Sequence, residues 1–175
     1  MTSFADGMRP WHDLYMLLGT ASATLIGLLF VAATVGSRYF TKETHAALRV
    51  FVSPSVVHFA CVFVGCLVAL MPTPSWELAG TLVGGTGLYG LVYALSVWRS
   101  IVRHGYHTRL DVEDSVYYVA APILLSGIFT AVGVLVMLRL GVAAELLAGL
   151  SAALLLVGIR NAWDMTVWTV IKTDG

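Results

Sequence analysis

The sequence has few charged residues. They make up 11% of its 175 residues, whereas hydrophobic residues make up 58%. A soluble domain has about 25% charged and about 45–50% apolar residues, so this chain lacks the charges needed to cover a water-facing surface. A disordered chain is also excluded, because disorder requires low hydrophobicity and high net charge, and the formal net charge here is +0. The absence of a basic excess argues against a nucleic-acid partner.

The residues that build metal, redox and catalytic sites are equally sparse. The two cysteines, Cys61 and Cys66, lie five positions apart in one apolar run. On a helix they would point about 140° apart, so we expect no disulfide between them. His104, His107 and Asp111 have helical spacing but lack a fourth ligand. With no nucleotide-binding loop, zinc-protease helix or serine elbow in the chain, we predict no enzymatic activity, catalytic residue, cofactor or metal.

Long apolar runs dominate the sequence, which has a mean hydropathy of +0.85. A membrane-spanning helix needs about 20 apolar residues, and the candidates are residues 14–35, 50–71, 78–98, 116–138 and 142–171. The first four contain no Lys, Arg, Asp or Glu. These runs are too long for barrel strands, which have about 10 residues with alternating polarity. The prediction is an all-α integral membrane protein with one transmembrane domain, residues 1–175, built as a five-helix bundle.

Basic residues are distributed unevenly between the two sides of this bundle. Eight belong to the first and third connections and the C-terminal end: Arg38, Lys42, Arg49, Arg99, Arg103, Arg109, Arg160 and Lys172. Arg9 and Arg139 belong to the other side. Because the basic side of a membrane protein faces the cytoplasm, we expect the N-terminus outside and the C-terminus inside. The expected location is the cell inner membrane.

Small residues recur at helical spacing in two of the predicted spans. Gly19, Ala23 and Gly27 are spaced for one helix face, and so are Gly80, Gly84 and Gly87. In lipid, helices associate where small residues let their backbones approach. These faces serve either packing within one bundle or docking of another subunit, and self-association is expected.

His58 is the one titratable residue deep inside the predicted membrane core. Ser55, Val62 and Gly65 share its helix face and form what we call the His58 seam. An ionisable residue within a membrane is a functional candidate by default. The alternative is a neutral imidazole hydrogen-bonded to a neighbouring helix.

The last predicted span carries charges at both ends. Six residues occupy about a third of its circumference, and we call them the charged stripe: Glu145, Gly149, Ala152, Leu156, Arg160 and Asp164. If the span starts near Val142, Arg160 reaches the inner interface and pairs with Asp164 at i, i+4. The stripe is either a wet or intersubunit face, or a packed face with interfacial charges.

Two segments carry a resemblance. The first predicted span contains GTASATLIGLLFVA at residues 19–32, and NAWD occupies residues 161–164. Both resemble segments of a group of uncharacterised small bacterial inner-membrane proteins. The resemblance implies a small multi-helix membrane architecture and a bacterial origin, and it implies no activity or site residue.

Little of the chain lies outside the predicted spans, so its function should lie within or around the bundle. The leading hypothesis is a homo-oligomeric ion channel or pore, with the charged stripe or the His58 seam near the permeation path. The second is an accessory subunit that binds another membrane protein through small-residue faces. A third, an intramembrane enzyme or redox carrier, requires a polar cluster around His58. Expected partners are membrane lipids, other copies of the chain and, for the second hypothesis, another membrane protein.

Overall fold

The protein is described by a computed structural model. It covers residues 3–36, 42–72, 75–103 and 116–173, with side chains except those of residues 35–36, 42–53 and 165–173. Every regular element within these ranges is helical, which confirms the predicted all-α class. The metal-ligand candidates His104, His107 and Asp111 lie outside the described residues.

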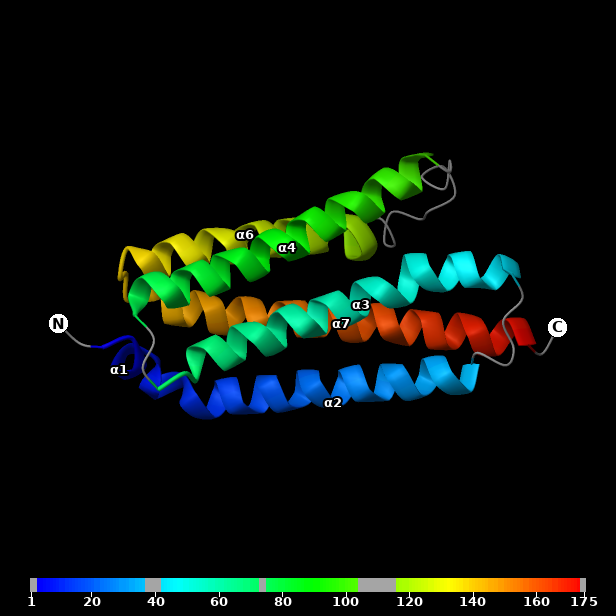
Figure 1. Ribbon diagram of the computed structural model, residues 1–175. Helices are drawn as coiled ribbons and strands as arrows, with labels where there is room; N and C mark the ends of the chain where they lie inside the picture. Colours follow the sequence, from blue (N-terminus) through cyan, green and yellow to red (C-terminus); the bar gives the residue numbers. More distant parts are fainter. Residues whose placement is uncertain (1–2, 37–41, 73–74, 104–115, 174–175) are drawn as a thin grey trace.

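Five long helices form the body of the molecule (Figure 1). They are α2 (His12–Gly36), α3 (Lys42–Ala69), α4 (Trp76–Arg103), α6 (Ala121–Met137) and α7 (Val142–Thr173). They lie side by side, and consecutive helices run in opposite directions. Three short elements accompany them: α1 (Phe4–Met8), the 3₁₀-helix η1 (Arg9–Trp11) and the π-helix η4 (Val116–Ala120). Each predicted span corresponds to a different long helix. The span 116–138 also includes η4, and the span 50–71 runs two residues past the end of α3.

Four helical stretches in the described part are long and apolar enough to cross a membrane: Phe4–Thr34, Trp76–Arg103, Val116–Met137 and Val142–Asp164. In α3 the described apolar stretch is shorter and runs over Pro54–Ala69. The structure extends α3 back to Lys42, eight residues before the predicted start, through a segment whose sequence includes Lys42, Glu43 and Arg49.

Apolar side chains occupy both the interior and the outer surface of the bundle. The interior holds Phe59 of α3, Phe129 of α6, and Leu147 and Leu154 of α7, all less than 2% exposed. Large apolar side chains also point outward from all five long helices, as at Phe30, Leu124 and Leu156. Helices that are apolar on all sides suit apolar surroundings.

The short N-terminal helix α1 packs at one end of the bundle. It is not among the helices predicted from the sequence. The Ser3 side chain accepts a hydrogen bond from the Asp6 backbone N–H, and the Asp6 carboxylate accepts from the Ser3 N–H, so a capping box starts α1. Phe4 and Met8 are buried, and the Phe4 ring meets Trp76 of α4 edge-on at 5.3 Å. These contacts attach α1 to the start of α4.

Candidate functional site

The His58 seam lies inside the bundle. Ser55 and Val62 are fully buried, His58 is 3% exposed, and Gly65 packs against the Phe129 ring of α6. Within the described part of the chain, no hydrogen-bond partner is found for Ser55 Oγ or His58 Nδ1. An unsatisfied buried polar atom costs about 1–3 kcal/mol. The seam therefore carries a free-energy cost that a purely apolar helix face would avoid.

Asn161 of α7 is a second buried polar residue, and it binds η4. Its side chain is fully buried, and Nδ2 donates to the Tyr117 carbonyl at 3.2 Å. The Tyr118 hydroxyl donates to the Asn161 carbonyl at 3.4 Å. Asn161 Oδ1 lacks a partner among the residues that the structure describes. Two bonds thus hold the π-helix to α7 and leave one amide acceptor unused.

Two prolines lie close in sequence to these buried polar residues. Pro122 stands at the start of α6, directly after η4, and it has no N–H to donate to the carbonyl four residues earlier. π-Helical turns are rare and often occur at functional sites, and both prolines and π-turns kink helices. Pro54 lies inside α3, one residue before Ser55. Pro54 is therefore next to a buried polar residue, and Pro122 lies four residues after Tyr118.

Helix register places the polar residues of α3 and α7 at a similar level of the bundle. A β-carbon at Gly158 of α7 would collide with the Phe59 ring of α3, so these two positions face each other. The helices run in opposite directions (Figure 1). Ser55 lies four residues before Phe59 and Asn161 three residues after Gly158, so the two residues lie at a similar level along the bundle axis.

His58 lies at nearly the same level of the bundle as Ser55 and Asn161. By the same register it lies about one helical turn from Asn161 along the axis. The Gly65–Phe129 contact gives the register of α3 with the parallel helix α6, and it places Ser55 level with η4. We call Ser55, His58, Tyr118 and Asn161 the polar junction of α3, η4 and α7. The sequence predicts Ser55 and His58 as site residues but not Asn161 and Tyr118, for which the NAWD segment and Pro122 are the only signals in the chain.

Arg160 and Asp164 lie beside this junction at the surface. Arg160 Nη1 and Asp164 Oδ2 are 2.7 Å apart, and the two side chains are 27% and 36% exposed. The Arg160 guanidinium also lies 3.8 Å from the centre of the Tyr117 ring, which adds a cation–π contact. The i, i+4 pair expected from the sequence is confirmed, and it borders the polar junction.

The rest of the charged stripe faces outward and is separate from the junction. Glu145 and Gly149 are exposed, Leu156 is 66% exposed, and Ala152 is half-buried. Nothing lies within 4 Å of a β-carbon added at Gly149. Glu145 is about 22 Å along α7 from Arg160. The His58 seam and the charged stripe are therefore different places, one internal and one on the outer surface.

The glycines of α4 pack against α6 of the same chain. A β-carbon at Gly80 or Gly87 would collide with the α6 backbone, and one at Gly133 of α6 would collide with Gly84. Such close approach is available only to glycine. This face is occupied within the chain, so it leaves no room for a second subunit.

Of the small residues of α2, one packs against α3 and the other two are exposed. A β-carbon at Gly19 would lie 3.2 Å from Cys66 Cβ of α3. Ala23 and Gly27 are exposed, and nothing lies within 4 Å of a β-carbon at Gly27. Only the first member of the predicted face packs closely on α3.

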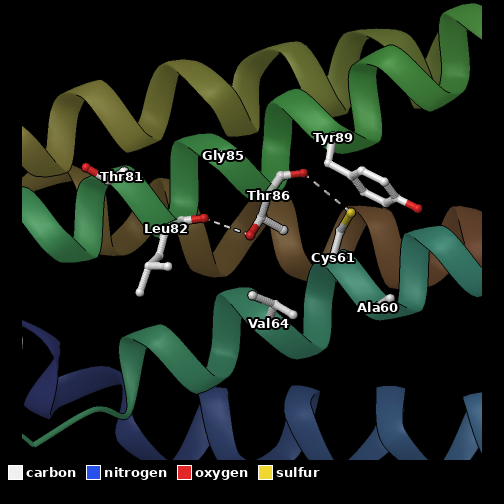
Figure 2. Close-up of a pocket in the computed structure, with 8 residues that line it drawn as sticks. All are labelled: Ala60, Cys61, Val64, Thr81, Leu82, Gly85, Thr86 and Tyr89. Atoms are coloured by element: carbon white, nitrogen blue, oxygen red, sulfur yellow. Dashed lines mark hydrogen bonds between the residues drawn. The ribbon is translucent and has the colours of Figure 1, made fainter.

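A groove of about 350 Å³ opens between α3 and α4 (Figure 2). Ala60, Cys61 and Val64 line it from α3, and Gly85, Thr86 and Tyr89 line it from α4. Cys61 Sγ donates to the Thr86 carbonyl at 3.7 Å, and Thr86 Oγ1 donates to the Leu82 carbonyl at 2.7 Å. Since these groups bond within the protein, the groove offers a mainly apolar surface.

Comparison of the chain with protein-family models, curated proteins and solved structures gives no match. Among the described residues, no group of three or more His, Cys, Asp or Glu side chains is placed to hold a metal ion. The geometry of the chain is therefore the basis for the function proposed below.

Proposed function

We propose that this chain is an inner-membrane protein that crosses the bilayer five times, with its N-terminus outside. The four apolar stretches and the shorter one in α3 support this, because they lie on five helices of alternating direction. Six basic residues of the described helices belong to the halves of α3, α4 and α7 at the end where α4 ends: Lys42, Arg49, Arg99, Arg103, Arg160 and Lys172. The positive-inside rule assigns that end to the cytoplasm.

We further propose that several copies assemble into an ion channel or pore. The observation that carries this proposal is the outward position of the charged stripe. A carboxylate on a lateral helix surface is unfavourable against lipid tails, whereas a second copy or a water-filled space accommodates it. The bare position at Gly149 lets another helix approach closely.

The packing of the single chain supports a path between copies. Large side chains fill the interior around Phe59, Phe129 and Leu147. Near the outer end, Arg139 binds the Glu77 carboxylate at 2.8 Å, whereas no ion pair among the described residues includes Glu145. In a ring of subunits, repeated Glu145 carboxylates would concentrate cations at the outer mouth.

The test is reconstitution of the purified protein into liposomes, with ion flux and native mass spectrometry as readouts. We expect flux from an oligomer, and a change in cation preference with Glu145→Gln. Gly149→Trp should dissociate the oligomer and abolish flux. Leu124→Trp is the matched control, because Leu124 is 63% exposed on α6, and it should change neither readout. A monomer without flux would refute the channel.

The second candidate is an accessory subunit of another membrane protein. The groove between α3 and α4 favours it, because Gly85 lies there with nothing within 4 Å of an added β-carbon. Crosslinking in the native membrane should then yield a defined complex that Gly85→Leu abolishes. Gly127→Leu on α6 is the control, since that position is also open. A complex that survives Gly85→Leu would exclude the groove as the docking surface.

A further inference from the structure

The polar junction combines three buried polar atoms from two helices. Ser55 Oγ, His58 Nδ1 and Asn161 Oδ1 each lack a hydrogen-bond partner among the described residues. Their parent residues are 0%, 3% and 0% exposed. The register of α3 and α7 places all three within about one helical turn along the bundle axis. Buried polar groups in folded proteins are nearly always bonded, either to protein or to ordered water.

The hydrogen-bonding capacity of the three atoms determines which kind of molecule fits the polar junction. Asn161 Oδ1 can only accept a hydrogen bond, whereas the Ser55 hydroxyl can donate or accept, and His58 Nδ1 does either according to its tautomer. Among the described residues, the carboxylate nearest to Asn161 in sequence is Asp164, and it is already paired with Arg160 rather than available to balance a cation. A small neutral molecule that both donates and accepts satisfies all three atoms.

We infer that the polar junction is an internal hydration site, in which bound water bridges Ser55, His58 and Asn161. Buried polar atoms at one level of a bundle that make no direct bond can be joined through one water. A buried water makes two to four hydrogen bonds, which matches the three atoms offered here. Asn161 adjoins the partly exposed Arg160–Asp164 pair, so water reaches the junction from that end of the bundle. His58 is thereby hydrated inside the membrane.

This inference does not depend on conduction or on oligomerisation. A monomeric protein without flux would contradict the channel and leave the hydration site unaffected. A dry junction in a conducting oligomer would contradict the hydration site alone. The two proposals are therefore tested separately.

The experiment is water-edited solid-state NMR of the full chain in lipid bilayers. The protein is labelled on its histidine, valine and phenylalanine side chains, and His58→Gln identifies the signal of the His58 ring. We expect magnetisation to pass from water to the His58 ring at mixing times at which Phe129 and Val132 still receive none. Both of these control residues are buried, at 0% and 1% exposed.

Variants test which atoms hold the water. Ser55→Ala and Asn161→Leu should each slow the transfer to His58 by about twofold or more, because one of the water's few partners is lost. Ser151→Ala is the matched control, because Ser151 is fully buried on α7 but ten residues from Asn161, and it should leave the transfer unchanged. The valine and phenylalanine shifts report whether each variant is folded.

Two results would overturn the inference. One is a His58 ring that receives no more magnetisation from water than Phe129 does. The other is a correlation showing the His58 ring bonded directly to the side chain of Ser55 or Asn161.

Discussion

Arg139 adopts a backbone conformation that is unusual for its residue type. Its φ is 58°, in the left-handed region, where it ends α6. The Arg139 N–H bonds to the Val136 carbonyl at 2.9 Å, and the Leu140 N–H to the Leu135 carbonyl at 3.1 Å. This is the Schellman pattern, which glycine normally completes. The side chain compensates in part through its ion pair with Glu77.

This conformation allows a prediction that separates backbone from side chain. Arg139→Gly and Arg139→Ala both remove the ion pair, but only alanine keeps the strain of the left-handed conformation. We expect the glycine variant to be more stable than the alanine variant by about 1 kcal/mol. The free energy of unfolding in detergent measures the difference. Equal stabilities would show that the turn relaxes to another conformation.

Tyr15 provides a second prediction for a single residue. It is fully buried on α2, and its hydroxyl donates to the Ala144 carbonyl of α7 at 2.7 Å. Tyr15→Phe should lower the free energy of unfolding by about 1 kcal/mol, because the bond is lost and a buried carbonyl loses a donor. Tyr89→Phe is the control, since Tyr89 is 60% exposed. An equal effect of both changes would contradict a structural role for the Tyr15 bond.

Among the elements, α4 and α6 approach most closely, and glycines make this possible. Gly80, Gly84 and Gly87 of α4 face Thr130 and Gly133 of α6. The sequence predicted a face of small residues on α4 but did not identify its partner. A row of glycines predicts that another helix packs closely against it. It does not specify which helix, because glycine has no side chain that one neighbour would fit better than another.

Two glycines of α6 form a matched pair for testing this interface. Gly133→Ala places a methyl group against the backbone of Gly84, and we expect a loss of about 1–3 kcal/mol from overpacking. Gly127→Ala has open space around it and should raise stability by up to about 1 kcal/mol through helix propensity. Thermal unfolding in detergent measures both. A neutral Gly133→Ala would mean that the helices separate at little cost.

The whole molecule is a bundle whose consecutive helices alternate in direction. Met71 lies after α3 and Gly141 before α7, at one end, and Arg103 ends α4 at the other. All three are exposed. The native cysteines are free and buried, so they should give little background in a labelling experiment.

Cysteine labelling therefore tests the proposed topology. We expect a membrane-impermeant thiol reagent to label Met71→Cys and Gly141→Cys from outside intact cells. Arg103→Cys should react only after the membrane is permeabilised, because the basic end faces the cytoplasm. Labelling of Arg103→Cys together with Met71→Cys in intact cells would contradict the five crossings.

The sequence by itself determined the all-α class, the positions of the long helices and the ion pair of Arg160 with Asp164. These follow from local properties, namely the length of apolar runs and the three- and four-residue spacing along a helix. Only the tertiary structure decided that the α4 glycines meet α6, that Glu145 and Gly149 of the charged stripe face outward, and that Asn161 binds η4. These depend on the register between helices that are distant in sequence, and in an almost uniformly apolar chain the pattern of side chains specifies that register only weakly.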